Sequence, residues 1–221
     1  MSTTQSNTQR AVSELRRMIF DAELSPGSDH LETELADMLG MSRTPIREAI
    51  LVLAEQGLVV LRPRRGIRVM AISVEDMRDI YDVLTELESL AAENAALQRY
   101  SPQDLSVMYE TIEAMDTALA KDDRIAWARA DNAFHKELVR LGKNARIEMI
   151  ATMMEDQVRR AKSITLHMRP TPLKSNRDHR ELLTTIQAGD PIKARELHHA
   201  HRRGARNVLI ELLVRHGLKR V

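Results

Sequence analysis

The sequence predicts a mainly α-helical protein in two parts: three helices followed by a β-hairpin, then a region built from helices alone. Three observations lead to this prediction. Apolar residues recur at helical spacing over most of the 221 residues, and short β-prone runs occur only before residue 71. Glycine and proline interrupt the pattern where helices and strands should end. Hydrophobic residues make up 43% of the chain, enough to form packed cores.

The first two helices are short and amphipathic. One is expected from Thr8 to Asp21, after a polar segment at residues 1–8 that is expected to be disordered. Its apolar positions are Val12, Leu15, Ile19 and Ala22. The turn Ser25-Pro26-Gly27 breaks the chain, and a second helix follows over residues 32–39. Gly40 should end it, because glycine readily adopts the left-handed conformation at helix ends.

The third helix begins within the segment SRTPIREAI. Thr44 is expected to cap it and Pro45 to occupy its first position. Its inward stripe is expected to consist of Ile46, Ile50 and Leu53. After Gly57, strands are expected over residues 58–61 and 67–70, joined by the tight turn Pro63-Arg64-Arg65-Gly66.

The remainder of the chain predicts a helical bundle. Six helices are expected over residues 75–99, 102–120, 123–141, 145–168, 176–188 and 191–216. Their starts carry capping residues and prolines, at Ser101-Pro102, Asn144 and Gly189-Asp190-Pro191. The predicted domains are therefore 1–72 and 73–221.

Composition narrows the function classes. The chain has no cysteine, which excludes a disulfide framework and thiolate metal sites and fits a cytoplasmic protein. No apolar run approaches the about 20 residues that cross a bilayer, and the N-terminus does not resemble a signal peptide. The net charge is +1, but residues 41–70 hold six arginines against two glutamates. Such a basic face can dock on nucleic acid, or it can be ordinary solvated surface.

Three helices followed by a hairpin define a winged helix-turn-helix, whose third helix enters the DNA major groove. Arg43 and Arg47 lie four residues apart and so share a helix face, and arginine is the common bidentate partner of guanine. The wing tip is expected to lie along a phosphate backbone or minor groove, with Gly66 permitting close approach. The alternative is that these arginines only solubilise a helix end. The candidate DNA contacts are Ser42, Arg43, Thr44, Arg47, Arg64, Arg65 and Gly66.

Four polar residues fall on the apolar faces of the later helices. Asp131 and His135 share the stripe of Phe134 and Leu138, because helical spacing places them on one side. His179 and His201 likewise lie among leucines on two further helices, whereas His198 and His199 are expected to face away, with Arg202 and Arg203. A buried charge is costly unless it is paired or bound to a metal. The candidate metal ligands are Asp131, His135, His179 and His201.

Each of these residues also has an ordinary interpretation. A single inward histidine can be a hydrogen-bonded core residue, and Asp131 with His135 can be a plain hydrogen-bonded pair. One ion would satisfy all four residues together. Three imidazoles and one carboxylate suit Zn²⁺, with Ni²⁺ or another first-row divalent ion as alternatives.

The first part resembles the GntR family of bacterial regulators. The segments LSPG, LADMLGM, SRTPIREAI and RPRRGIRV occur in the family's order over about residues 10–70. The resemblance implies that Arg43, Thr44, Arg47 and Gly66 contact DNA. Thr33 stands where members often carry an arginine that contacts phosphate or base.

The second part resembles the FCD effector-binding domain of the FadR-type members, through ADNAFH, DHRELLTTIQAGD and His201. The resemblance implies the same four metal ligands, a small organic acid as effector, and a homodimer that reads a palindromic operator. The resemblance favours repression over activation. It also implies a protein of the bacterial cytoplasm that is associated with the nucleoid. Leu84 and Thr85 occupy positions where many members have an arginine that pairs with an anionic effector or buttresses the pocket. Nearby, Glu86 is expected on a solvated face, while Glu88 is left open between the pocket and the surface.

Two alternatives remain open from sequence. An enzyme could use an ion held by these four residues to activate water, but no further acid or base stands out and SRTPIREAI would be unexplained. A DNA-binding protein could instead carry a purely structural ion in a dimerisation domain. A regulator that responds to an effector accounts for both halves of the chain.

Overall fold

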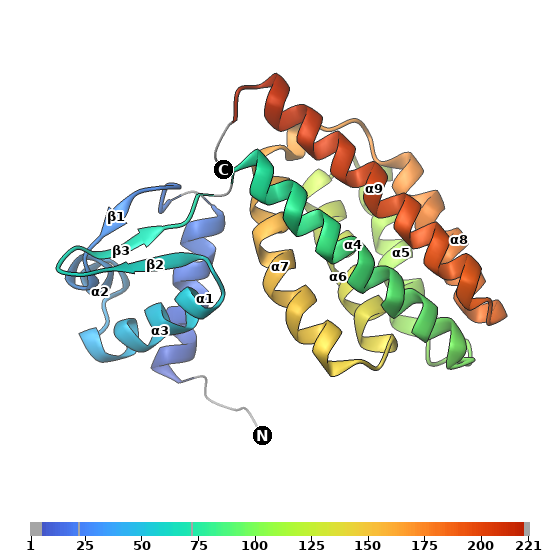
Figure 1. The fold of residues 1–221 in the computed structure, drawn as a ribbon, viewed down its shortest axis with the longest axis horizontal. Coiled ribbons are helices and arrows are strands. Elements are labelled where there is room, and N and C mark those ends of the chain that lie inside the picture. The colour runs from blue at the N-terminus through green and yellow to red at the C-terminus, as the bar shows by residue number, and fades with distance from the viewer. Residues whose placement is uncertain (1–5, 22, 72, 219–221) are drawn as a thin grey trace. The chain divides into compact units, whose positions relative to one another are not determined.

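A computed structural model describes residues 6–21, 23–71 and 73–218. The described chain forms two compact units, which divide between Ser73 and Val74. The first unit combines helices with a small sheet, and the second contains helices alone (Figure 1). The predicted fold class, mainly α with a winged helix-turn-helix before a helical bundle, is confirmed. None of the described helices is long and apolar enough to span a bilayer.

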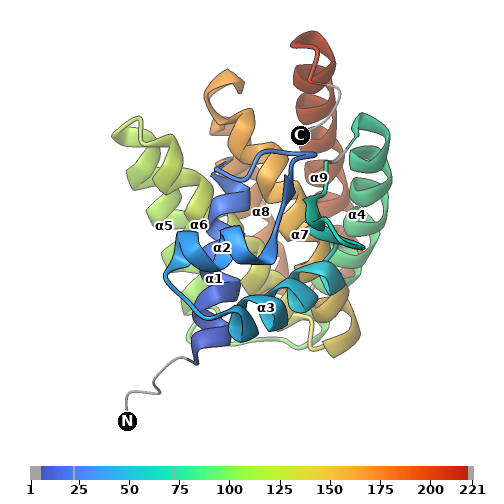
Figure 2. The same ribbon diagram turned by 90° about the vertical axis from the view of Figure 1, so that its left-hand side faces the viewer.

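The first unit contains three helices and a three-stranded antiparallel sheet of order β1-β3-β2. Its elements are α1 (Asn7–Phe20), β1 (Asp29–His30), α2 (Glu32–Leu39), α3 (Arg43–Glu55), β2 (Val59–Arg62) and β3 (Gly66–Val69). Helix α1 packs across α3 (Figure 2). The predicted stripe of α3 is confirmed, because Ile46, Ile50 and Leu53 are fully buried in this core with Leu15 of α1.

Two of the three predicted helix starts in this unit need correction. Residues 1–8 are not disordered throughout: Ser6 caps α1 in a capping box with Gln9, and α1 already includes Thr8. Residues 1–5 and Ala22 lie outside the described part of the chain. Ser42, not Thr44, occupies the cap position of α3, so Pro45 is the third helical residue. Proline is tolerated there because the amides of the first turn have no intrahelical partner.

The strand β1 was not predicted, and it gives Gly66 a structural role. Two residues are too few to show the alternation that marks a strand, yet Asp29 and His30 pair with Arg68 and Ile67 of β3. Gly66 has a φ of +77°, and a Cβ there would lie 2.1 Å from the carbonyl oxygen of His30. The fold itself therefore requires glycine at this position, whether or not DNA approaches it.

We expect Gly66→Ala to destabilise the first unit by about 3 kcal/mol or more, since it combines a left-handed backbone with a backbone overlap. The measurement is urea unfolding of the full chain. Gly27→Ala is the matched control, because Gly27 has a φ of +78° and no atom within 4 Å of the position that a Cβ would take. It should lose only the roughly 1–2 kcal/mol of the backbone conformation. Equal losses in the two variants would contradict the predicted overlap.

The second unit contains six helices and one short 3₁₀ turn among its described residues. They are α4 (Val74–Leu97), α5 (Ser106–Ala120), α6 (Arg124–Leu141), α7 (Ala145–Ile164), η1 (Leu166–Met168), α8 (Leu173–Ala188) and α9 (Pro191–Arg215). The long helices α4 and α9 lie side by side (Figure 1). The core between α5, α6 and α8 includes Met115, Phe134, Leu138 and Ile186, all fully buried.

Three helix boundaries of this unit differ from the predicted ones by three residues or more. Helix α5 begins at Ser106, not at residue 102, because Asp104 accepts hydrogen bonds from the backbone and hydroxyl of Ser101 and closes a separate turn. Helix α7 ends at Ile164, where the chain tightens into η1. Helix α8 begins three residues before the predicted Asn176, at Leu173, directly after Pro172.

Candidate metal centre and DNA-reading surface

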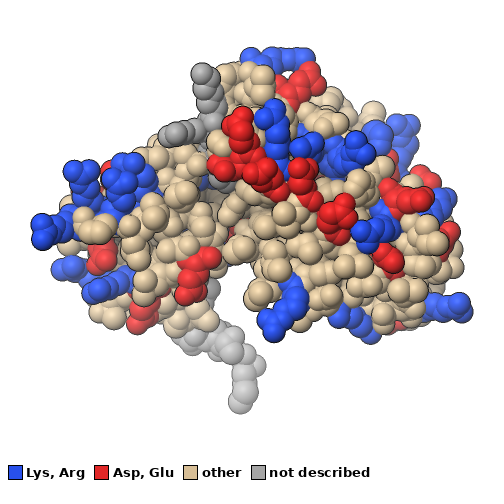
Figure 3. Space-filling view, in the orientation of Figure 1, with Lys and Arg blue, Asp and Glu red and all other residues tan. Residues whose placement is uncertain are grey.

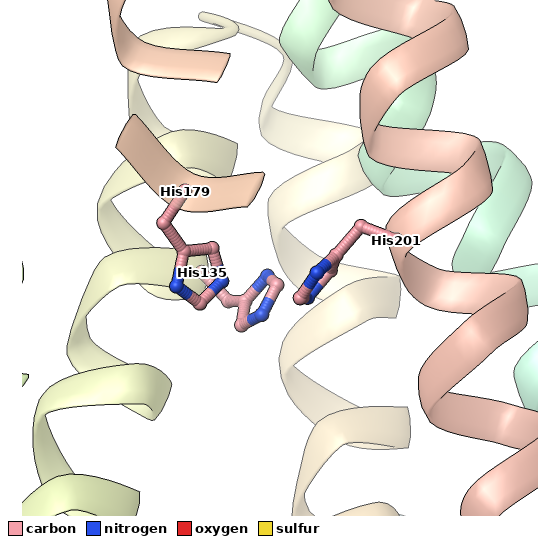
Figure 4. A group of neighbouring side chains, drawn as sticks. All are labelled: His135, His179 and His201. Atoms are coloured by element: carbon pink, nitrogen blue, oxygen red, sulfur yellow. The ribbon is translucent and has the colours of Figure 1, made fainter. Parts of the chain in front are cut away.

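Three buried histidines from three helices converge in the second unit (Figure 4). His135 comes from α6, His179 from α8 and His201 from α9, and each is at most 8% exposed. One ring nitrogen of each lies within 4.8 Å of the others. Asp131, one turn before His135, places Oδ1 3.7 Å from Nε2 of both His135 and His179. The structure thus brings together all four residues that the helix faces predicted.

Neighbouring groups orient three of these four side chains. Nδ1 of His135 lies 3.3 Å from Oε2 of Glu88, and Nδ1 of His201 lies 3.2 Å from Oδ2 of Asp178. Lys162 donates a 3.0 Å hydrogen bond to Oδ2 of Asp131. In each pair the neighbouring group lies at one donor atom of the candidate ligand: Nδ1 of His135 and of His201, and Oδ2 of Asp131. The second donor atom, Nε2 or Oδ1, is left for the cluster. Metal ligands in proteins are commonly oriented in this way by neighbouring polar groups.

The cluster has the chemistry that a divalent ion requires. Nε2 of His135 and both ring nitrogens of His179 have no hydrogen-bond partner among the described residues. Burial lowers the pKa of His135 and lowers that of His179 well below the usual range, so both rings are neutral at neutral pH. Burial alone would raise the pKa of Asp131, but Lys162 and the nearby imidazoles hold it below its ordinary value. Neutral imidazoles and a carboxylate are ligands that Zn²⁺ accepts.

A second buried cluster adjoins the first, and the sequence prediction for it was wrong. His198 and Arg202 do not face away: both are fully buried, next to Glu88 of α4. Oε1 of Glu88 lies 3.2 Å from Nη2 of Arg202, and Oε2 lies 3.3 Å from Nε2 of His198. Arg202 also lies over the ring of Tyr81, 5.3 Å from its centroid. Helix α9 packs on both α4 and α8, so its buried face is wider than a single stripe.

Glu88, His135 and His198 could themselves be considered as metal ligands, since their donor atoms also lie within 4.8 Å of one another. Electrostatics disfavours an ion there. Burial would raise the pKa of Glu88, but the charge of Arg202 and the adjacent imidazoles hold it well below the ordinary value. Glu88 already has a permanent cation as its partner. It is therefore better described as a charged neighbour of His135, 3.3 Å from its Nδ1, than as a ligand of a second ion.

Other acids on α4 and α7 have distinct surroundings. Glu86 is exposed, as expected, and pairs with Arg195 and His199 of α9. Glu155 of α7 is partly buried, and burial raises its pKa to about 7. Leu84 and Thr85 are both buried in the bundle.

The predicted DNA contacts of the first unit lie on its exposed surface. Lys and Arg side chains gather over this unit at the left of Figure 3. A groove of ≈ 570 Å³ separates the start of α3 from the wing, with Arg43 and Arg47 on one side and Arg62 and Arg64 on the other. The prediction did not include Arg62. Ser42, Thr44 and Arg65 are exposed too, whereas Gly66 is half-buried against β1.

Arg43 is partly held in place by α2. Its Nη2 lies 3.7 Å from Oε2 of Glu32, although the arginine side chain remains 70% exposed. Thr33, where the resemblance led us to expect an arginine, lines the same groove. The groove can accept a polyanion, because arginines stand on both of its sides.

This architecture, a winged helix-turn-helix followed by a helical bundle with a polar interior, defines a DNA-binding protein with a candidate ligand-sensing domain. Residues 7–69 match the bacterial regulatory proteins of the gntR family, and residues 79–204 match the FCD domain. The chain belongs to the GntR family of transcriptional regulators, in the branch that carries an FCD domain. Its relatives are regulators rather than enzymes.

Individual relatives agree with this assignment. A helix-turn-helix regulator from an unstable DNA locus of Streptomyces ambofaciens is 33% identical over 193 residues, covering 86% of this chain and 79% of its own. A regulator from the TAR-I ttuE-ttuC' intergenic region of Agrobacterium vitis is 39% identical over 127 residues, or 57% of this chain and 74% of its own.

Solved structures share the fold. A putative GntR regulator from Rhodococcus sp. RHA1 has a TM-score of 0.73 at 25% identity, covering 92% of this chain and 97% of its own. Escherichia coli McbR has a TM-score of 0.76 at 22% identity, covering 95% and 99%. At that identity the second likeness establishes the fold alone.

Proposed function

We propose that the protein is a metabolite-responsive repressor whose second unit binds one divalent metal ion and a small organic acid. The observation that carries this proposal is the convergence of three buried histidines, of which His135 and His179 have ring nitrogens without hydrogen-bond partners among the described residues. Repression is supported by relatives that include a probable D-xylose utilization operon repressor of Paenarthrobacter nicotinovorans, 29% identical over 174 residues. The protein would act in the bacterial cytoplasm, on the nucleoid.

Asp131, His135, His179 and His201 would hold the ion, with Zn²⁺ as our first choice and Ni²⁺ or another first-row ion as alternatives. The ion would supply a Lewis-acidic position for one oxygen of the acid. Glu88, Asp178 and Lys162 would keep the ligand atoms oriented towards it. An organic acid that binds one arrangement of the bundle more tightly than another would shift the population that binds DNA.

We further propose that two copies of the chain pair and read a palindromic operator, one half-site for each recognition helix. Arg43 and Arg47 would read base edges, with Ser42 and Thr44 on phosphate or base. Arg64, Arg65 and Gly66 would place the wing along the backbone or minor groove. Support comes from the exposure of the six side chains and from the groove between α3 and the wing.

Replacement of Arg47 tests the DNA-reading part of this proposal. We expect Arg47→Ala to weaken binding to the operator by about 1–3 kcal/mol, because a bidentate contact with guanine would be lost. The measurement is a fluorescence titration with operator DNA and with random duplex at one salt concentration. Arg68→Ala is the control, since Arg68 is paired with Asp29 instead of facing the groove. An equal loss on both DNAs would make Arg47 a phosphate contact, and no loss on either would exclude it.

A further inference from the structure

A cavity of ≈ 290 Å³ opens beside the histidine cluster in the second unit. Its walls are formed by the start of α6, the segment around residues 169–172, and one face of α9, and its lining includes His201. Most of that lining is apolar, with Leu119, Trp127, Pro170 and Val208 among its residues. The cavity is therefore a mainly apolar space with a candidate metal ligand, His201, in its wall.

The polar atom of Trp127 is already occupied. Its Nε1 donates a 2.8 Å hydrogen bond to Oδ1 of Asn176, and Asn176 in turn donates to Asp116 at 2.7 Å. The indole can therefore offer the cavity only apolar surface. Hydroxyl groups of a ligand placed against this wall would lose their water without gaining partners, which costs binding energy.

The acidic residues in the lining are also occupied. Asp123 caps α6 by accepting from the amide of Ala126 at 2.9 Å. Asp178 binds His201 at 3.2 Å and Lys174 at 2.6 Å. The side chain of Asp122 is 88% exposed and lies 3.9 Å from Nε of Arg124.

Arg169 is different, because it lines the cavity with donor capacity to spare. Its Nε donates to Oγ1 of Thr165 at 3.1 Å, but its buried Nη2 has no hydrogen-bond partner among the described residues. A buried guanidinium donor without an acceptor is unfavourable. Burial also lowers the pKa of Arg169. A carboxylate is the group that matches this donor in charge and shape.

Gly204 supplies a second observation. It lies inside the 25-residue helix α9, where glycine is about 1 kcal/mol less favourable than alanine. No atom lies within 4 Å of the position that its Cβ would take, so packing among the described residues does not require glycine. Gly204 lines the cavity, and its missing side chain leaves the rim open.

We propose that this cavity is the effector site and that its ligand is a small monocarboxylate with an apolar aliphatic or aromatic body, anchored by Arg169 and admitted past Gly204. This inference rests on the proposed function, and it narrows the organic acid to an apolar class. The apolar body lies against Trp127 and Pro170. Hydroxyl groups of a polyhydroxylated acid would be unpaired against this wall, so such an acid should bind more weakly than an apolar one.

Calorimetric titration of the full chain tests the inference, with benzoate as the probe. Benzyl alcohol is the uncharged analogue and gluconate the hydroxyl-rich acid. We expect the dissociation constant of benzoate to be lower than that of benzyl alcohol or gluconate by a factor of roughly ten or more. Gly204→Leu, which fills the rim, and Arg169→Met, which removes the donor, should each weaken benzoate binding by a similar factor. Arg203→Leu is the control, because Arg203 is exposed on α9 and does not line the cavity.

Metal content and operator affinity of each variant are measured first, which separates this inference from the proposed function. Unchanged benzoate binding in Gly204→Leu and Arg169→Met would overturn the site. Tighter binding of gluconate than of benzoate would overturn the ligand class. In either case a chain that still held metal and released DNA with an acid would retain the proposed function. Failure of both benzoate and gluconate to bind would overturn the inference, and it would also count against the proposal that an organic acid is the effector.

Discussion

His179→Ala is expected to abolish metal binding by the protein. Purified wild type should contain about one divalent ion per chain, and the variant should contain none, because a buried cluster that loses one of three imidazoles no longer closes around an ion. His179 is the cleanest position to replace. Removing His135 would leave Glu88, 3.3 Å away, without one of its partners. Removing His179 would break no hydrogen bond, because neither of its ring nitrogens has a partner among the described residues.

The ion should also stabilise the second unit. A ligand present at about 100 times its dissociation constant contributes about 2.7 kcal/mol, which corresponds to roughly 5–10 °C in Tm for a chain of this size. Chelation should therefore lower the Tm of wild type by that amount and leave the Tm of His179→Ala unchanged. The same chelation should change operator affinity if the ion supports the DNA-binding arrangement.

His199→Ala provides the control for both measurements. His199 lies on α9, two residues before His201, but it faces the exposed carboxylate of Glu86 and is not part of the cluster. Its replacement should leave metal content and the effect of the chelator unchanged. If elemental analysis finds no ion in wild type, or finds the same amount in His179→Ala, the metal site is wrong. Asp131 and the histidines would then form a polar core in which water must satisfy the unpartnered nitrogens of His135 and His179.

The contrast between His201 and His198 shows how far sequence periodicity reaches. Asp131, His135, His179 and His201 could be grouped from sequence because each lies within a single apolar stripe of its helix. His198 could not, because a stripe defines one buried face and α9 has two neighbours, α4 and α8. Its packing against α4 brings Glu88 of that helix to His198 and Arg202, residues more than 100 positions later in the chain. No local pattern encodes such a contact.

The wing gives the same lesson on a smaller scale. The hairpin was visible in its β-prone runs and in Pro63-Arg64-Arg65-Gly66, but β1 was not. Gly66 was interpreted from sequence as a point of close approach to DNA. The structure shows an approach by the carbonyl of His30. A glycine signals that space is needed, and only the tertiary fold shows which group needs it.

The buried ion pair of Glu88 and Arg202 leads to the second large prediction. Arg202→Met should destabilise the second unit by about 3–5 kcal/mol, because it leaves a fully buried carboxylate without its permanent cation. The measurement is the urea unfolding free energy of that unit. Arg195→Met is the matched control. Arg195 also projects from α9 to carboxylates of α4, Glu86 and Glu93, but its side chain is 39% exposed, so its loss should cost less than about 1 kcal/mol.

The double variant Glu88→Gln/Arg202→Met separates the charge from the shape of these side chains. Once the carboxylate is gone, the missing guanidinium leaves no unpaired buried charge, so the double variant should recover much of the stability that Arg202→Met loses. It should still bind the ion more weakly than wild type, since a neutral carboxamide would be a poorer acceptor for Nδ1 of His135 than the carboxylate of Glu88. If Arg202→Met lowers the free energy of unfolding no more than Arg195→Met does, then water, and not Arg202, compensates the charge of Glu88. Restored stability together with weakened metal binding would instead indicate that Glu88, balanced by Arg202, holds His135 in place.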